Sequence, residues 1–299
     1  MKLTIIVCYY RGHKHIEECL KSIVPQLIEG NVECLVIENG AVVDENIKNK
    51  YREVRYIGIE INSGLGPARN LGLKLAQGEF VWYVDDDAWI PPGMIKYLLK
   101  SVLLEDCIYG GGLVLNANDQ YVLSKVYHNF YYSPLQKALR LIIGTNMYFR
   151  TSVLKSIEGF HSELNRADET YVVKKLSDKG LEGSFISTVE VFHNQPYELP
   201  HIIRVFIDNG RYRCKMSQSL RAKTIRTALH SLTFMIPVVA IFSLQLTVLL
   251  VMTRFFYSKT HLILVRKNFF LWPIIIVFNA WRIVLEDYGY AKEFARNIF

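Results

Sequence analysis

Three consecutive carboxylates, Asp85, Asp86 and Asp87, directly follow the apolar segment Phe80–Val84. An apolar run this short is typical of a buried strand, because it is too short for a helix. Three adjacent carboxylates repel one another unless a cation lies among them. At the carboxyl end of a parallel strand, that cation is commonly a divalent metal that also binds a phosphorylated ligand. The alternative is an acidic turn that caps the next helix.

A glycine-rich segment, Asn62–Gly72, precedes this strand and contains Arg69. Glycines allow the backbone to approach a phosphate closely, and an arginine can bind a phosphate through two parallel hydrogen bonds. The alternative is an ordinary turn between a strand and a helix, which Gly64 and Gly66 taken singly favour.

Strands and helices must alternate to position these segments. The apolar patterns predict strands over 3–9, 34–37, 54–59 and 80–84, and helices over 15–27, 67–77 and 91–104. This alternation predicts an α/β fold with three layers around a mostly parallel sheet. Ligands bind such sheets outside the carboxyl ends of the strands. We therefore expect Cys8–Arg11, Glu38–Asn39 and Asp85–Asp87 to face one crevice.

The pattern is less regular beyond residue 107. Gly110–Gly112 permits a close approach of two backbones or a tight bend, and 142–149 predicts a strand pair or a bend. A helix is predicted over 170–179, and a strand over 185–192 that ends at His193.

The charge is unevenly distributed along the chain. The net charge is +7, but residues 201–299 alone carry 14 Lys and Arg against 4 Asp and Glu. This predicts an anionic partner for the tail only. The basic residues alternate with long apolar runs, which favours a membrane surface over nucleic acid. Nucleic-acid binding is not expected of the α/β part, where basic residues do not gather on an aromatic platform.

Two uncharged stretches in the tail predict membrane contact. Ser231–Thr253 has 23 residues without a charge, enough to cross a bilayer, and Asn268–Trp281 has 14, which Arg282 could lengthen by snorkelling. The alternative is a pair of buried helices. Basic residues flank the first stretch and predict that the preceding domain lies on the cytoplasmic side.

These features predict three regions: a catalytic domain over 1–200, a basic amphipathic juxtamembrane segment over 201–230, and hydrophobic helices over 231–299 that anchor the chain in a membrane. The helices would form one or two spans or a re-entrant segment. Five scattered cysteines without a CxxC pair argue against a disulfide framework or a zinc site and fit a reducing compartment. The N-terminus resembles a first strand more than a signal peptide.

The order of the motifs resembles that of the family 2 glycosyltransferases of GT-A fold. The motifs in chain order are Glu38–Gly40, Asn62–Gly72, Ala76–Val81, Asp85–Asp87, Gly144–Arg150, Gly159–Phe160, Asp168–Glu169 and His193. Together they cover about residues 3–195. The resemblance implies a Rossmann-like α/β/α domain. It also implies a metal-dependent, inverting transfer of a sugar from a nucleotide-diphospho-sugar to a glycan or lipid-linked acceptor.

The resemblance implies roles for single residues. Asp85 and Asp87 match the outer positions of the family's DxD motif, where Asp87 would bind Mn²⁺ or Mg²⁺ and Asp85 the ribose or the metal. His193 is implied as a further ligand of the metal or the diphosphate; the alternative is a capping or core histidine. The other residues implied in binding the nucleotide-sugar are Tyr9, Arg11, Glu38, Asn39, Arg69 and Asp86.

The family's Glu-Asp base motif is reversed here, as Asp168-Glu169. In an inverting transfer a carboxylate must deprotonate the acceptor hydroxyl. Position matching gives this role to Glu169, whose side chain is one methylene longer than the family's residue, and leaves Asp168 as a rival. The alternative is an acidic pair stabilised by the dipole at a helix N-terminus.

Two other functions fit the sequence. One is a metal-dependent nucleotidyltransferase on a similar sheet, which would release diphosphate in place of a nucleoside diphosphate. The other is a non-catalytic membrane protein that retains a fold for binding sugar nucleotides, which the reversed Asp168-Glu169 pair supports.

Overall fold

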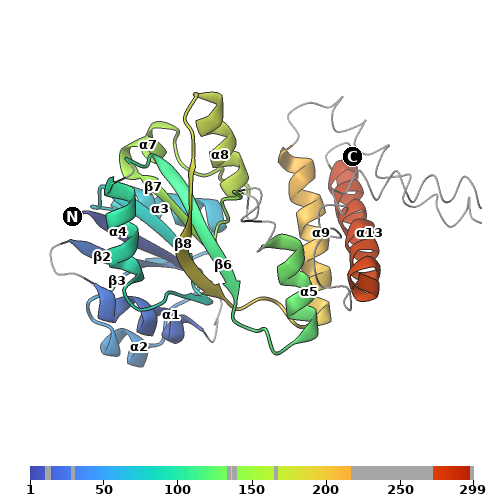
Figure 1. Ribbon diagram of the computed structural model, residues 1–299, viewed down its shortest axis with the longest axis horizontal. Coiled ribbons are helices and arrows are strands. Elements are labelled where there is room, and N and C mark those ends of the chain that lie inside the picture. Colours follow the sequence, from blue (N-terminus) through green and yellow to red (C-terminus); the bar gives the residue numbers. More distant parts are fainter. Residues whose placement is uncertain are drawn as a thin grey trace, which may run out of the picture. The chain divides into compact units, whose positions relative to one another are not determined.

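The computed structural model describes residues 1–10, 15–27, 31–104, 106–132, 136, 140–164, 168–216 and 272–296 (Figure 1). The chain divides into two compact units. The first comprises Met1–Asp119 and Tyr131–Gln195, and the second Gln120–Phe130 and Pro196–Phe299. Gln120–Phe130 thus belongs to the second unit, although in the sequence it lies between the two parts of the first.

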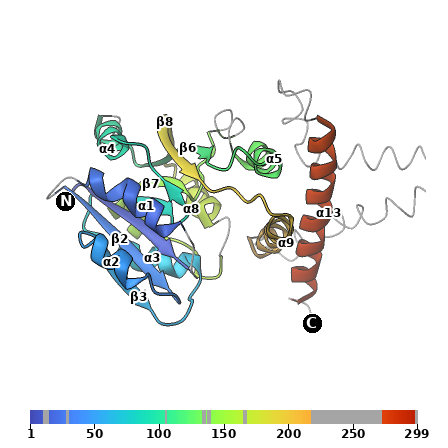
Figure 2. The ribbon, with the colours of Figure 1, turned by 90° about the horizontal axis from the view of Figure 1, so that it is seen from below.

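Eight strands of the first unit form one sheet in the order β3-β2-β1-β4-β7-β6-β8-β5. They are β1 (Leu3–Tyr9), β2 (Val32–Asn39), β3 (Arg55–Ile59), β4 (Phe80–Asp85), β5 (Ala88–Trp89), β6 (Tyr109–Asn116), β7 (Asn146–Arg150) and β8 (Ser184–His193). The four strands β1 to β4 are parallel, as Figure 2 shows for β2 and β3 side by side. In the other half β7 runs antiparallel to β4 and β6, and β5 runs antiparallel to β8. The predicted mostly parallel pairing therefore holds throughout the N-terminal half, whereas the other half is mixed, because β6 and β8 pair in parallel there.

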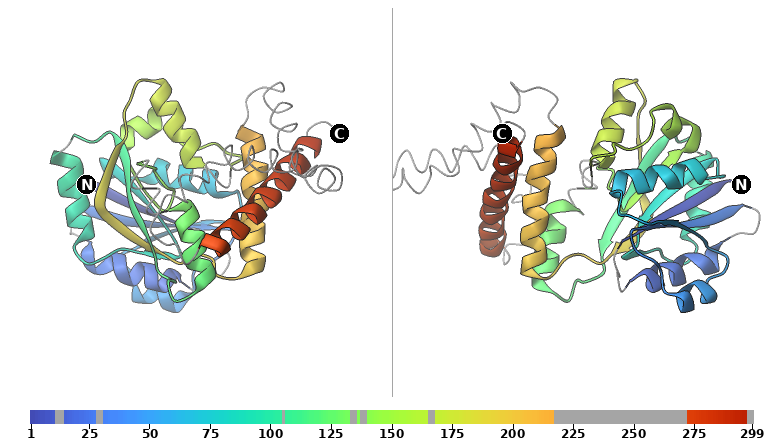
Figure 3. Two further views of the ribbon diagram at one scale, coloured as in Figure 1. Left: turned by 45° about the vertical axis from the view of Figure 1, so that its right-hand side comes forward. Right: turned by 180° about the vertical axis from the view of Figure 1, so that it is seen from behind.

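Helices cover both faces of this sheet (Figure 3). Those of the first unit are α1 (Ile16–Ile23), α2 (Glu45–Lys50), α3 (Leu65–Leu75), α4 (Met94–Leu104), α7 (Thr151–Ser156) and α8 (Asp168–Asp178), with a 3₁₀ turn at Val24–Gln26. Because side chains of a strand alternate between faces, Ile5 packs with α1 and α4 while its neighbour Ile6 packs with α3, α7 and α8. The predicted three layers are therefore present.

The parallel register brings the carboxyl ends of the strands to one edge. Cys8 of β1 lies beside Asp85 of β4, and Tyr9 lies beside Glu38 of β2. The edge is extended by β8, whose last residue, His193, pairs with Ala88. Residues from distant parts of the sequence therefore meet here.

The glycine run at 110–112 lies inside β6 and does not form a bend. A Cβ atom at Gly110 would collide with the carbonyl oxygen of Ser184, and one at Gly112 with that of Val189. The register between β6 and β8 shifts directly after Gly112. Of the two sequence interpretations, close approach of two backbones is confirmed.

The second unit contains α5 (Val122–Tyr131), α9 (Leu199–Met216) and α13 (Trp272–Arg296), and α13 packs against α9 and crosses it (Figure 3). The two helices approach closely at two glycines, because a Cβ atom at Gly210 would collide with the backbone of α13, and one at Gly289 with that of α9. Arg213 Nη1 lies 2.6 Å from Glu286 Oε2, and Arg211 Nε lies 3.4 Å from Glu293 Oε2.

Both arginines belong to the basic segment over 201–230, for which the sequence predicts contact with an anionic membrane surface. In the structure they pair with carboxylates of α13. The acidic partners lie more than 70 positions away in the sequence, so the charge pattern of the segment alone could not indicate them.

None of the helices in the described part of the chain combines the length and the apolar run that crossing a bilayer requires. The helix α13 includes the second uncharged stretch from Trp272 onward, but Arg282, Glu286 and Asp287 follow within the same helix. The first stretch, Ser231–Thr253, lies outside the described residues.

Asn146 joins four strands from the first position of β7. Its Oδ1 accepts a hydrogen bond of 3.0 Å from Trp82 Nε1 of β4, and its Nδ2 donates to the carbonyl oxygens of Leu113 in β6 and Val189 in β8. The side chain is fully buried. Loss of this amide would leave an indole N–H and two carbonyls without their partner, away from water.

We expect Asn146→Ala to lower the free energy of unfolding by about 3 kcal/mol, since each buried polar group left unsatisfied costs roughly 1–3 kcal/mol. Urea denaturation followed by circular dichroism measures the change. The matched control is Asn49→Ala at an exposed helical position, expected to change stability by less than about 0.5 kcal/mol. Equal stability of the two variants would contradict the bridging role of Asn146.

Candidate active site

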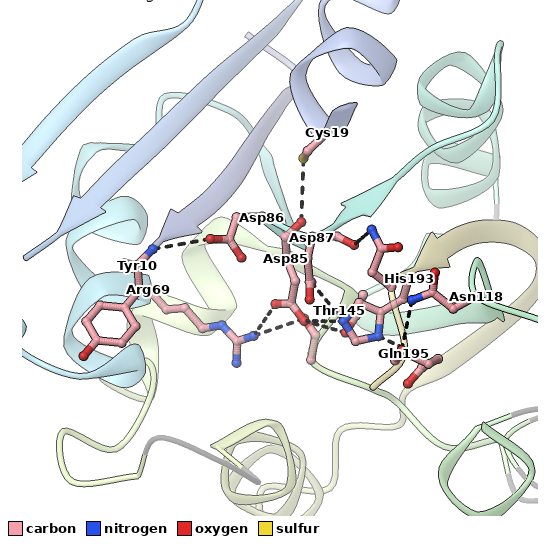
Figure 4. Close-up of polar contacts among 12 residues, drawn as sticks. Tyr10, Cys19, Arg69, Asp85, Asp86, Asp87, Asn118, Thr145, His193 and Gln195 are labelled. Atoms are coloured by element: carbon pink, nitrogen blue, oxygen red, sulfur yellow. Dashed lines mark hydrogen bonds and ion pairs between the residues drawn. The ribbon is translucent and has the colours of Figure 1, made fainter. Parts of the chain in front are cut away.

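Asp85, Asp87 and His193 form a cluster at the carboxyl edge of the sheet (Figure 4). His193 Nε2 lies 3.0 Å from Asp87 Oδ1 and 4.0 Å from Asp85 Oδ2. One potential ligand atom from each residue lies within 4.8 Å of the others. The short pairing of β5 with β8 brings Asp87 close to His193, because Ala88, the residue after Asp87, lies opposite His193. The structure thus brings together the three residues that the sequence predicts as metal ligands.

Two neighbours hold the carboxylate of Asp85. Thr145 Oγ1 donates a hydrogen bond of 2.5 Å to Oδ2, and Arg69 Nη2 lies 3.3 Å from Oδ1. Thr145 is buried directly before β7, the strand antiparallel to β4. Sequence analysis did not single out Thr145, although it lies within the Gly144–Arg150 motif.

Asp86 points away from this cluster, toward the end of β1 (Figure 4). Its Oδ2 accepts a hydrogen bond of 3.3 Å from the backbone N–H of Tyr10. Burial and the charges of Asp87 and Asp85 raise the pKa of Asp86 well above its usual range, which favours the neutral carboxyl. Asp86 and Asp87 form the turn between β4 and β5, and within this turn the middle aspartate separates from the outer two.

Arg69 connects the cluster to the start of α8. Its Nη1 lies 2.5 Å from Asp168 Oδ2, and its Nη2 lies 3.3 Å from Asp85 Oδ1 and 3.2 Å from the carbonyl oxygen of Gly144. Arg69 is 3% exposed and Asp168 is 1% exposed. Burial lowers the pKa of Arg69, but the two aspartates more than offset this and raise the pKa, so the guanidinium stays charged. In this structure it binds internal acceptors, whereas the sequence predicts a phosphate contact.

Glu169 follows Asp168 in the first turn of α8 and makes different contacts. A Cβ atom at Gly144 would lie 3.5 Å from Glu169 Oε2 and 3.0 Å from Arg69 Nη2, so the glycine leaves space beside both groups. Burial, and after it the charge of Asp168, raise the pKa of Glu169 to about 8 against the opposing effect of Arg69. Glu169 is therefore a carboxyl group that exchanges a proton near neutral pH.

Glu38 and Asn39 support loops near the edge of the sheet. Glu38 Oε1 accepts a hydrogen bond of 2.6 Å from the N–H of Val43 and lies 3.0 Å from Lys48 Nζ. Asn39 accepts from the N–H of Ser63 and donates to the carbonyl oxygen of Gly64, which fixes the glycine-rich turn.

Tyr9, which the resemblance also implies in nucleotide-sugar binding, does not join the cluster, because its side chain is buried in the core beside α1. Arg11 lies outside the described residues. The structure therefore concentrates the predicted site residues on Asp85, Asp87, His193, Arg69, Asp168 and Glu169.

Gln195 is a site residue that sequence analysis missed. It is fully buried, and its Nε2 lies 2.9 Å from His193 Nδ1. The only signal in the sequence is its position two residues after His193, which places it on the same side of an extended chain.

Comparison with known proteins identifies the family of this arrangement. The family model described as Glycosyl transferase family 2 matches residues 4–158, slightly more than half of the chain. The chain belongs to this family. The resemblance inferred from the sequence motifs is confirmed.

Curated relatives agree with the family. The poly(ribitol-phosphate) beta-N-acetylglucosaminyltransferase TarS of Staphylococcus aureus is 34% identical over 238 residues, which cover 70% of this chain and 41% of TarS. Glycosyltransferase GlyA of Streptococcus pneumoniae is 32% identical over 107 residues, which cover 34% of this chain and 15% of GlyA. The chain thus spans less than half the length of either relative.

Solved structures show that the fold is GT-A-like. Residues 1–349 of S. aureus TarS in complex with UDP-GlcNAc superpose with a TM-score of 0.55 and 17% identity, covering 99% of this chain and 92% of that one. The mannosyltransferase PcManGT of Pyrobaculum calidifontis, in complex with GDP-Man and Mn²⁺, superposes with a TM-score of 0.62 and 15% identity, covering 97% of this chain and 86% of that one.

We expect Arg69→Met to lower the free energy of unfolding by about 3–5 kcal/mol, because it leaves the buried carboxylate of Asp168 without its cation. Guanidinium chloride denaturation measures the loss. The double variant Arg69→Met/Asp168→Asn should recover part of the stability, because it removes the unpaired charge. A double variant whose loss equals the sum of the two single losses would show that the two side chains act independently.

Proposed function

We propose that the chain is a metal-dependent, inverting glycosyltransferase that uses a nucleotide-diphospho-sugar as donor. One observation carries the proposal: Arg69 contacts both Asp85, which lies beside Asp87 and His193, and Asp168, which precedes Glu169. A cation site and a proton acceptor are thereby held near each other at one edge of the sheet. These are the two functions that transfer of a sugar with inversion requires.

The ligand chemistry of Asp85, Asp87 and His193 fits a divalent cation. Two carboxylates favour Mn²⁺ or Mg²⁺, and the imidazole favours Mn²⁺ of the two, because Mg²⁺ is bound mainly by oxygen. A cation bound by these three residues would neutralise the charge that develops on the leaving diphosphate. Thr145 and Arg69 hold Asp85 in position for this task.

The contacts at the start of α8 favour Glu169 over Asp168 as the base. Asp168 forms an ion pair with the buried guanidinium of Arg69, which commits its carboxylate to a structural contact. Glu169 is half-buried, and its pKa of about 8 suits removal of a proton from an acceptor hydroxyl.

The relatives supply the first substrates to test. The name of TarS gives an N-acetylglucosaminyl group and a poly(ribitol phosphate) acceptor, and its structure holds UDP-GlcNAc. We propose UDP-GlcNAc as the first donor and a cell-wall glycopolymer as the first acceptor. A lipid-linked acceptor and a membrane anchor remain predictions based on Ser231–Thr253.

We expect purified protein to release a nucleoside diphosphate from one member of a panel of nucleotide-sugars in the presence of Mn²⁺ and acceptor. This release should stop when EDTA is added. Asp87→Ala should lower kcat/KM by at least about a hundredfold, since it removes a group that stabilises charge in the transition state. The control is Asp119→Ala outside the cluster, expected to keep full activity. Activity that persists in EDTA would disprove the metal role, and release of inorganic diphosphate would indicate a nucleotidyltransferase.

We expect kcat/KM to rise with pH, by about tenfold per unit below the pKa of Glu169 near 8, because only the ionised carboxylate accepts a proton. Glu169→Gln should abolish this rise and lower kcat about 10²- to 10⁴-fold, while leaving donor affinity within about threefold. Asp178→Asn, at the exposed end of the same helix, is the matched control and should reproduce the wild-type profile. A wild-type profile that is flat between pH 6 and 9 argues against Glu169 as the base.

A further inference from the structure

Gln195 and Asp87 contact opposite nitrogens of the His193 ring (Figure 4). Gln195 Nε2 lies 2.9 Å from Nδ1, and Asp87 Oδ1 lies 3.0 Å from Nε2. The Gln195 side chain is fully buried, and its backbone carbonyl accepts a hydrogen bond of 3.0 Å from Asn118 Nδ2. The backbone of Gln195 is therefore fixed beside the ring, with the buried amide against Nδ1.

The direction of the hydrogen bond determines which ring nitrogen carries the proton. An amide nitrogen can only donate, so Nδ1 of His193 accepts and has no proton. In the neutral ring the proton is then on Nε2, where it points to Asp87 Oδ1. A nitrogen that carries a proton has no lone pair for a metal, so this arrangement suits the cluster without a cation.

The same amide can serve the opposite arrangement. Its Oε1 is buried and has no hydrogen-bond partner among the described residues. A half-turn of the amide places Oε1 where Nε2 now lies. The hydrogen bond from the amide nitrogen to Nδ1 is then lost, and one from Nδ1 to Oε1 replaces it. Oε1 would then accept from a proton on Nδ1, which leaves the lone pair of Nε2 directed toward Asp85 and Asp87.

We propose that Gln195 is a positioning residue that sets which nitrogen of His193 carries the proton, and that its amide turns when a divalent cation binds to Asp85, Asp87 and His193. The inference rests on the proposed function, because it assumes that this cluster binds the cation. It explains why an amide stands here: a carboxylate can only accept, and an apolar side chain can do neither.

The first test measures the His193 ring directly. Long-range ¹H–¹⁵N spectra of protein labelled at its 8 histidines, assigned with a His193→Gln variant, show which ring nitrogen is protonated. We expect the proton on Nε2 in metal-free wild type and on Nδ1 after addition of Mg²⁺. Gln195→Glu should place a proton on Nδ1 even without metal, and Gln195→Met should leave a mixture of both forms. Identical spectra of His193 in all three proteins would overturn the proposal.

The second test measures Mn²⁺ affinity by electron paramagnetic resonance. We expect Gln195→Met to weaken binding about 10- to 100-fold, as loss of such a supporting hydrogen bond does at other metal sites, and Gln195→Glu to stay within about tenfold of wild type. The matched control is Gln26→Met, whose amide binds the carbonyl oxygens of Ser22 and Pro91, and it should leave affinity unchanged.

The outcomes separate this inference from the proposed function. Wild-type affinity in Gln195→Met, with transfer and metal binding intact, would overturn the role of Gln195 alone. No Mn²⁺ binding by the wild type would overturn both the metal role of the cluster and the turn of the amide. Weaker binding in both Gln195→Met and Gln26→Met would assign the effect to general destabilisation and overturn the specific role.

Discussion

The site depends on one buried cation, the guanidinium of Arg69, which lies between Asp85 and Asp168. A charge in the interior is costly unless partners neutralise it, and here the partners come from the end of β4 and the start of α8. The end of β4 and the start of α8 must therefore meet at Arg69. Two parts of the chain separated by more than 80 residues are thus held at a defined distance.

This constraint divides the acidic residues by task. Asp168 neutralises Arg69, and Asp86 is buried against the end of β1, so both have structural contacts. Asp85 and Asp87 instead lie beside His193, and Glu169 lies near Gly144. Asp86 and Asp87 thus have different surroundings, and so do Asp168 and Glu169. Different surroundings are a general way to give chemically similar carboxyl groups different roles.

Two basic residues of the tail have acidic partners within the chain. The excess of basic residues predicts an external anionic partner, and Arg211 and Arg213 pair with carboxylates of α13. Close packing of α9 on α13 through Gly210 and Gly289 makes these pairs possible. The uncharged stretch at 231–253 is the feature on which a membrane role still rests.

Consecutive residues were enough to predict the α/β order, the bounds of β1, β3 and β4 to within a residue, and the family, because apolar periodicity and sequence motifs are local properties. The motifs also indicated Asp85, Asp87 and His193 as candidate ligands. The folded chain alone shows that Arg69 faces inward, that Asp168 pairs with it, and that Gln195 contacts His193. These contacts join residues distant along the chain or depend on the direction of a side chain, and neither is encoded in local spacing.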